Sequence, residues 1–269
     1  MSNPKQNIDK QCVQVFDAAT GENDTYGLKS REEKERITEE DIRKHWDIRA
    51  QRPDVQSVMS TRHTLKENKR ATAEGQRDVF EFLEGLVEGK KVFELGVGIG
   101  RMTAEIAKRA REVVGNDLSP VMLERARQNL KDFDNIQLLL GKITELDLSP
   151  KSFDLVFVSS VLAHILDPGE LRVTIKKMQE LSDKIFILEH TYEGLDSSIS
   201  KYSILRKIEE YQELFAPYRL NKQKTHRCVG DNFTLMLFEK YESKKYRDVS
   251  IRKSKIAEAF KVGVDDLIK

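Results

Sequence analysis

The sequence predicts an α/β fold built on a doubly wound, mostly parallel sheet. Three observations support this prediction. From residue 91 onward, short apolar runs alternate with segments long enough to form crossover helices. The runs are continuously apolar, as a sheet covered on both faces requires. Strands separated by helices of this length are joined by right-handed crossovers and lie parallel.

The N-terminal part differs in character from the region that follows. Residues 1–37 are polar and highly charged, and most of them are expected to form a solvated, partly disordered arm. Thr38 and Asp41 then have the spacing of a capping box. Apolar residues recur at helical intervals after them, which predicts a short amphipathic helix that carries Trp46 and ends by Pro53.

The central segment is predicted to supply five strands and the helices that join them. A helix at about 74–87 precedes the first strand, because its apolar residues form one stripe. The apolar runs expected to form strands are 92–95, 113–116, 136–140, 155–158 and 185–188. The helical segments between them are 102–109, 120–130 and 170–181.

The sheet is predicted to end in an antiparallel hairpin. After a further helix at about 200–215, runs at 219–228 and 233–241 flank a short Gly-Asp-Asn turn. Strands this close in sequence pair as antiparallel neighbours. Residues 242–269 are rich in basic side chains, with apolar residues near helical spacing. We expect a helical extension that docks on its own domain or on a second subunit, as in a homodimer.

A glycine-rich turn follows the first central strand. Val92–Leu95 leads into Gly96-Val97-Gly98-Ile99-Gly100 and then into a predicted helix. Glycines at this place permit a sharp turn and let a ligand approach the backbone and the helix N-terminus. The next strand ends at Asp117, and an acidic residue there is suited to hold both hydroxyls of a ribose. These features predict a site for an adenosine-containing cofactor.

The spacing of the glycines distinguishes two kinds of cofactor. Dinucleotide binding requires Gly-x-Gly-x-x-Gly, and Arg101 stands where the last glycine would be. The observed pattern is Glu94-x-Gly96-x-Gly98-x-Gly100. At this point the chain resembles the class I S-adenosylmethionine-dependent methyltransferases of the small-molecule type.

The resemblance covers about residues 65–241, including the region 153–164 and the antiparallel last strand. It implies a Rossmann-like fold with S-adenosylmethionine as the cofactor. It also implies three parts: an N-terminal arm and helical cap at 1–64, the cofactor-binding domain at 65–241, and the charged helical extension at 242–269.

The resemblance assigns cofactor-binding roles to the turn and to the strand ends. Gly96 and Gly98 would pack under the methionine part of the cofactor. Glu94 would orient the turn or the amino group, and Asp117 would bind the ribose. Gly100 completes the turn, and Ser159 would lie at the methionine end.

The adenine is expected beside Leu118 and Met122, although these two would be core residues in most folds. The family usually has Gly-Asp after the third strand, and this chain has Gly141-Lys142. The carboxylate that would accept a hydrogen bond from the adenine amino group is therefore absent. The backbone N–H of Ile143 could still face the ring.

The expected catalytic residues are His164 and His190, which follow the fourth and fifth strands. The sulfonium is already activated, so a base is needed only if the acceptor arrives protonated. Each histidine could instead be a packing residue. Trp46 is expected to form a lid over the substrate, because the helix around it looks like the family's N-terminal cap. Tyr192 lies two residues after His190 and is expected to contact the substrate.

Composition excludes several classes of function. The 46 basic and 45 acidic side chains give a net charge of +1, which argues against general electrostatic binding of nucleic acid or anionic lipid. Cys12 and Cys228 cannot form a zinc cage, and the five histidines lack ligand spacing, so we expect no metal. No secretory signal or membrane-length apolar run appears, which predicts a cytoplasmic protein without membrane contact.

The sequence therefore predicts a methyltransferase that acts on an oxygen or nitrogen of a small organic acceptor. Two alternatives remain open at this stage: an RNA methyltransferase, and a non-catalytic S-adenosylmethionine-binding protein. The Asn/Asp-Pro-Pro-aromatic motif of enzymes that methylate amino groups in nucleic acids is missing, since Ser159-Ser160-Val161-Leu162 stands there. This absence argues against a nucleic acid substrate, and the basic extension keeps it under consideration.

Overall fold

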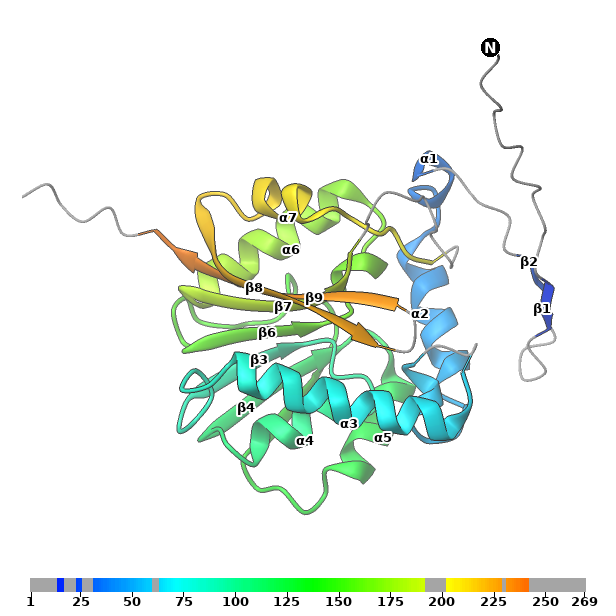
Figure 1. Ribbon diagram of the computed structural model, residues 1–269, viewed down its shortest axis with the longest axis horizontal. Coiled ribbons are helices and arrows are strands. Elements are labelled where there is room, and N and C mark those ends of the chain that lie inside the picture. Colours follow the sequence, from blue (N-terminus) through cyan, green and yellow to red (C-terminus); the bar gives the residue numbers. More distant parts are fainter. Residues whose placement is uncertain are drawn as a thin grey trace, which may run out of the picture. The chain divides into compact units, whose positions relative to one another are not determined.

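The computed structural model describes residues 14–16, 23–25, 31–59, 63–191, 202–228 and 231–241 (Figure 1). The described residues up to Glu239 belong to one compact unit. The strands of the main sheet are β3 (Lys91–Leu95), β4 (Glu112–Asp117), β5 (Ile136–Leu140), β6 (Leu155–Ser159), β7 (Lys184–His190), β8 (Tyr218–Cys228) and β9 (Asp231–Lys240).

Helices follow most of these strands, as the sequence predicts. Before the sheet come α1 (Arg31–Lys34), α2 (Glu39–Arg49), the 3-10 turn η1 (Asp54–Ser57) and α3 (Leu65–Phe82). Within and after the parallel part come α4 (Arg101–Ala107), α5 (Pro120–Asn129), the 3-10 turn η2 (Leu162–His164), α6 (Pro168–Leu181) and α7 (Ile208–Leu214).

The seven-stranded sheet has the order β5-β4-β3-β6-β7-β9-β8. All neighbours from β5 to β7 run parallel, whereas β9 pairs antiparallel with β7. The doubly wound sheet and its C-terminal hairpin are thus confirmed. The strand order reverses at β3, because β4 and β5 lie on one side of it and β6 lies on the other. Open α/β sheets bind ligands at the carboxyl ends of their strands at such a switch point.

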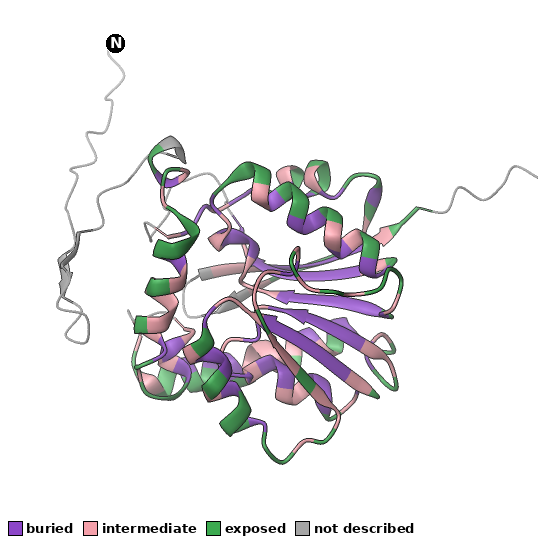
Figure 2. Ribbon diagram, turned by 180° about the vertical axis from the view of Figure 1, so that it is seen from behind, coloured by how far each residue is buried: buried purple, intermediate pink, exposed green. Residues whose placement is uncertain are grey.

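Both faces of the sheet are covered, which explains the continuously apolar strands. Along β6, Val156 and Val158 pack into the core beneath α6 and α7. Leu155 and Phe157 pack into the opposite core with α3 and α4. Figure 2 shows the central strands buried along most of their length. A residue that is polar inside such a strand must therefore have a specific partner or face a ligand.

The helix α2 lies at the carboxyl ends of the strands (Figure 1). It begins with the expected capping box, in which Thr38 Oγ1 accepts from the backbone of Asp41 and the Asp41 side chain accepts from the backbone of Thr38. The hydroxyl of Ser119 donates to Asp47 Oδ1 at 2.6 Å. Arg125 on α5 donates to the carbonyls of Ala50 and Arg52 at 2.6 and 2.7 Å. These bonds join the helix to the elements that follow β4.

Two predicted helices differ from the structure, and one pair of strands was not predicted. The helix expected at 74–87 begins at Leu65, because Thr64 and Glu67 form a second capping box ahead of a polar first half. The helix expected at 200–215 is the shorter α7, and residues 192–201 lie outside the described ranges. Two short strands that the sequence did not predict, β1 (Gln14–Phe16) and β2 (Asn23–Thr25), pair antiparallel in the arm.

The predicted extension at 242–269 lies outside the described residues, so it stays a prediction. Among the residues that are described, no helix is long and apolar enough to cross a membrane.

The packing of β4 against the turn after β3 generates a stability prediction. A Cβ at Gly115 would clash with Val97 Cγ1, so Gly115→Ala should lower the free energy of unfolding by about 1–3 kcal/mol. Gly75 in α3 has no atom within 4 Å of an added Cβ. Gly75→Ala should therefore raise the free energy of unfolding by about 0.5–1 kcal/mol. Urea unfolding measures both, and equal effects of the two substitutions would contradict this packing.

Candidate active site

The turn after β3 is held tightly against β4. Gly96 has φ +75°, and a Cβ there would clash with Val161 Cγ2 in the loop after β6. The backbone amides of Gly96 and Val97 donate to the carbonyl of Asn116 at 2.9 and 3.0 Å. A side chain at Gly96 would therefore push apart the two loops that flank the strand-order reversal. Gly100 lies farther along as the N-cap of α4, outside the cavity wall.

Asp117 sits where β4 ends, and the backbone amides of two elements converge on its carboxylate. Oδ2 accepts from the Gly98 amide at 2.8 Å, and Oδ1 accepts from the Ser119 amide at 2.9 Å. Its recessed position raises the pKa of Asp117 to about 6, against the lowering effect of these amides. Each carboxylate oxygen has a further lone pair, so Asp117 can still accept hydrogen bonds from two hydroxyl groups.

Several buried polar atoms of the strand ends lack a hydrogen-bond partner among the described residues. They are Glu94 Oε2 on β3, Asn116 Oδ1 on β4 and Ser159 Oγ on β6. Burial raises the pKa of Glu94 to about 8, against the lowering effects of the nearby Thr103 hydroxyl and of the positive charge of Arg101. Buried polar groups without partners are rare in native proteins and indicate a site that a polar ligand completes.

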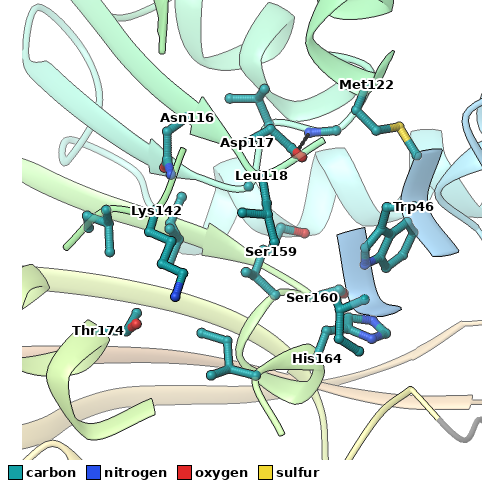
Figure 3. Close-up of a pocket in the computed structure, with 18 of the residues that line it drawn as sticks. Trp46, Asn116, Asp117, Leu118, Met122, Lys142, Ser159, Ser160, His164 and Thr174 are labelled. Carbon is teal, nitrogen blue, oxygen red and sulfur yellow. Dashed lines mark hydrogen bonds between the residues drawn. The ribbon is translucent and has the colours of Figure 1, made fainter. Parts of the chain in front are cut away.

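These residues line one cavity of about 390 Å³. The side chains of Trp46 and His164 lie together at one end and those of Lys142 and Thr174 at the other, with Ser159 between them (Figure 3). The cavity wall also contains all but three of the residues that the sequence predicted for the site, namely Trp46, Glu94, Gly96, Gly98, Asp117, Leu118, Met122, Ile143, Ser159 and His164.

His164 has a defined tautomer. Its Nδ1 lies 2.7 Å from the carbonyl of Tyr202, which can only accept, so Nδ1 carries the proton. The ring stands edge-on to Trp46, with centroids 4.9 Å apart. Burial lowers the pKa of His164 to about 4, and the charges of Arg49 and Arg206 act in the same direction. The imidazole is therefore neutral near pH 7, and Nε2 retains its lone pair.

Two buried charged residues outside the cavity wall, Glu189 and Arg206, hold the loop that carries His164. Glu189 at the end of β7 accepts hydrogen bonds from the backbone amides of Val161, Leu162 and Ala163 at 2.7 to 3.3 Å. Arg206 donates to the carbonyls of Leu162 and Ile165 at 2.7 and 3.0 Å. Burial raises the pKa of Glu189 to about 7. Sequence reasoning placed neither residue in this role.

Lys142 has an unexpected position at the other end of the cavity. Its ammonium group pairs with Glu39 of α2, and Glu170 of α6 lies 3.8 Å away. The hydrogen bond with Glu39 raises the pKa of Lys142. From the sequence, Lys142 was noted only as the residue in place of the family's acid, whereas the structure uses this side chain to tie the cap helix to the loop after β5.

Besides Gly100, the predicted residue His190 does not belong to the cavity wall. His190 pairs with Phe233 across β7 and β9, and its ring stacks on that phenylalanine at 5.1 Å. Tyr192 lies outside the described residues. Of the wall residues that the prediction missed, Asn116 had one sequence signal, because it is a polar residue inside a buried apolar strand. Within the described ranges, no group of three or more His, Cys, Asp or Glu side chains could hold a metal ion.

Comparison with known proteins agrees with this geometry. Residues 92–183 match a family model described as "Methyltransferase domain". The chain is 28% identical over 122 residues to phosphoethanolamine N-methyltransferase 1 of Caenorhabditis elegans, covering 45% of this chain and 25% of that protein. It is 32% identical over 103 residues to demethylmenaquinone methyltransferase of Clavibacter sepedonicus, covering 38% and 42%. The chain thus spans less than half the length of these curated relatives.

Solved structures share the fold. Phosphoethanolamine N-methyltransferase 1 of Haemonchus contortus, in complex with phosphoethanolamine and S-adenosylhomocysteine, superposes with a TM-score of 0.60 at 19% identity. The match covers 90% of this chain and 57% of that one. The N-methyltransferase NodS of Bradyrhizobium japonicum, in complex with S-adenosylhomocysteine, gives a TM-score of 0.60 at 16% identity, covering 75% and 99%.

The raised pKa of buried Glu94 predicts a specific pH dependence of stability. Between about pH 4.5 and 8 the folded state holds a proton that the unfolded state has lost, so this carboxyl lowers the free energy of unfolding as pH rises. Relative to the wild type, Glu94→Gln should gain more than about 1.4 kcal/mol between pH 5 and pH 8, the equivalent of one pKa unit. Urea unfolding of ligand-free protein measures this gain.

The matched control is Glu81→Gln, which changes an exposed carboxylate on α3. It should show no such drift relative to the wild type. A constant difference between Glu94→Gln and the wild type at both pH values would mean that Glu94 is not buried as described.

Proposed function

We propose that this chain, which carries a class I S-adenosylmethionine-dependent methyltransferase domain, transfers a methyl group from that cofactor to an oxygen or nitrogen of a small organic acceptor. The observation that carries the proposal is the convergence of the glycine turn, Asp117 and two unpartnered atoms, Glu94 Oε2 and Ser159 Oγ, on one cavity. Each of these features suits one part of the cofactor. A cytoplasmic location and a homodimeric assembly, both expected from the sequence, belong to the same proposal.

The cavity residues fit S-adenosylmethionine in their chemistry. We assign the ribose hydroxyls to Asp117, whose carboxylate keeps accepting capacity beside two backbone amides. We assign the methionine amino group to Glu94 and the space beside it to Gly96 and Ser159. Leaving Oε2 of this buried carboxylate without a partner is costly, and a cationic ligand group would remove that cost.

The adenine ring is assigned to the apolar part of the same wall. Leu118, Met122 and Ile143 line it, and Met122 and Ile143 are almost fully buried. Asn116 adds an unpartnered carbonyl oxygen, which can accept a hydrogen bond from an amino group. This amide offers an acceptor in a site whose β5 loop has Lys142 instead of an acid.

The bound cofactor supplies a methyl group on a positively charged sulfur, which leaves as a neutral thioether. The protein must then place the acceptor atom and exclude water. The cap helix α2 lines the cavity through Trp46 and other residues. The Ser119–Asp47 hydrogen bond joins this helix to the loop after β4, to which we assign the ribose. Binding of the cofactor and closure of the cap helix over it therefore involve the same loop.

We assign the proton-accepting role to His164 rather than to His190, which lies outside the cavity wall. Nε2 of His164 can accept a hydrogen bond from an O–H or N–H of the acceptor and thereby orient its lone pair. A hydroxyl oxygen that gains a methyl group becomes a strongly acidic oxonium, whereas a methylated amine nitrogen is only a weak acid. A base with a pKa of about 4 is therefore sufficient for the proton of an oxygen acceptor, and an amine acceptor must arrive already deprotonated.

A labelling experiment tests the proposed function. Purified protein with S-adenosylmethionine labelled in the methyl group should transfer label to a small-molecule extract and leave total RNA unlabelled. Asp117→Ala is the binding control, and it should weaken cofactor affinity in calorimetry by about 1.5–3 kcal/mol, typical of a hydrogen bond to a charged group. Label in RNA, or binding without label in either fraction, would favour one of the two alternatives to a small-molecule enzyme.

His164→Ala should lower turnover by about 10²–10⁴-fold, the usual contribution of general acid–base catalysis. Its affinity for the cofactor should stay within about threefold of the wild type, because the assigned cofactor contacts lie elsewhere. His190→Ala is the matched control and should keep turnover near the wild-type rate. Turnover of His164→Ala at the wild-type rate would remove this residue from the mechanism.

A further inference from the structure

We propose that the acceptor is an uncharged, flat, largely apolar ring compound that carries one hydroxyl group, and is not a phosphate or carboxylate. This inference rests on the proposed function and specifies its substrate class. It follows from the residues at one end of the cavity, which we call the acceptor end: Ile37, Ile42, Trp46, His164 and Leu166.

The acceptor end is apolar on most of its surface. Ile42 and Leu166 are buried in one cluster, against which Ile37 and Trp46 pack. Trp46 also contributes to a second cluster with Met122, so its ring spans from the assigned adenine wall to the acceptor end. Apolar walls with an aromatic side chain stabilise flat apolar ligands by burial and by ring contacts.

Nε2 of His164 supplies one hydrogen-bond acceptor at this end. Its Nδ1 is held by the Tyr202 carbonyl, so only Nε2 can serve a ligand. Ser160, which directly follows β6, has φ +56°, and its amide donates to the Leu188 carbonyl at 2.8 Å. This left-handed turn directs the chain after β6 across the cavity wall. One fixed acceptor in an apolar wall suits one hydroxyl on an apolar ring.

Three cations are already engaged by the protein, of which Arg49 and Arg206 lie near the acceptor end and Lys142 at the opposite end. Arg49 lies over the Trp46 ring at 5.0 Å and donates to the Ser57 carbonyl at 3.1 Å. Arg206 is buried and donates to loop carbonyls beneath His164. Lys142 pairs with Glu39 of the cap helix.

Carboxylates predominate among the charged groups that line the cavity. Glu39, Asp167 and Glu170 all belong to its wall. An anionic acceptor would lose its hydration, meet this excess of negative charge, and find Arg49, Arg206 and Lys142 already engaged. The charge distribution therefore selects against phosphate esters and acids, whereas a neutral hydroxyl compound meets no such penalty.

The test compares two ligands that differ only in the charged group. Protein saturated with S-adenosylhomocysteine is titrated with 1-naphthol and with 1-naphthyl phosphate in a calorimeter. We expect 1-naphthol to bind at least tenfold more tightly. Equal or tighter binding of 1-naphthyl phosphate would overturn the inference, and so would an absence of 1-naphthol binding.

Titration with S-adenosylhomocysteine alone separates this inference from the proposed function. If S-adenosylhomocysteine does not bind, the proposed function fails. Titration of ligand-free protein with 1-naphthol and 1-naphthyl phosphate then still tests the acceptor end. If S-adenosylhomocysteine binds and the phosphate is preferred, only the substrate class is wrong.

Two variants link the preference to named residues. Ile37→Lys adds a cation at a half-buried position ahead of α2 and should shift the affinity ratio toward 1-naphthyl phosphate by at least tenfold. Trp46→Phe should keep 1-naphthol affinity within about threefold, whereas Trp46→Ser should lose at least tenfold. Affinity for S-adenosylhomocysteine, measured in each variant, shows whether the fold is intact. An unchanged ratio in Ile37→Lys with intact thioether binding would contradict the inference.

Discussion

The recessed carboxylate of Asp117 is the interaction on which the rest of the site depends. It accepts from Gly98 in the turn after β3 and from Ser119 at the start of α5. Ser119 in turn donates through its hydroxyl to Asp47 of the cap helix. One acidic side chain thus sets the relative positions of the turn, the next helix and, through Ser119, the cap. Because removing a carboxylate from water is costly without hydrogen bonds, backbone amides converge on it.

Near the acceptor end, backbone amides converge in the same way on a different acid. Glu189 accepts three backbone amides of the loop after β6, and Arg206 donates to carbonyls of the same loop. At both places, therefore, a loop packs around a recessed carboxylate at the end of a parallel strand. His164, on the loop after β6, is thus positioned by two residues that lie outside the cavity wall. Rigid support of this kind is what transfer between two bound molecules requires.

Much of the fold could be predicted because burial on both faces imposes continuously apolar strands, and β3, β4, β6 and β7 show that pattern. The glycine turn and Asp117 were predictable because their spacing reflects local backbone geometry. The start of α3 was missed because the first half of that helix is polar, and only its capping box at Thr64 marks the start. His164 and His190 look alike in sequence, and only the pairing of β7 with β9 separates them. Likewise, the pairing of Lys142 with Glu39 depends on where a distant helix packs.

The central claim is that the glycine turn and the acid one strand away recognise an adenosyl group attached to methionine. Calorimetric titration of the purified, ligand-free chain with S-adenosylmethionine, S-adenosylhomocysteine and NAD tests it most directly. We expect both methionine-derived ligands to bind with one site per chain and NAD to produce no binding heat. Saturable binding of NAD together with no response to the other two would contradict the account.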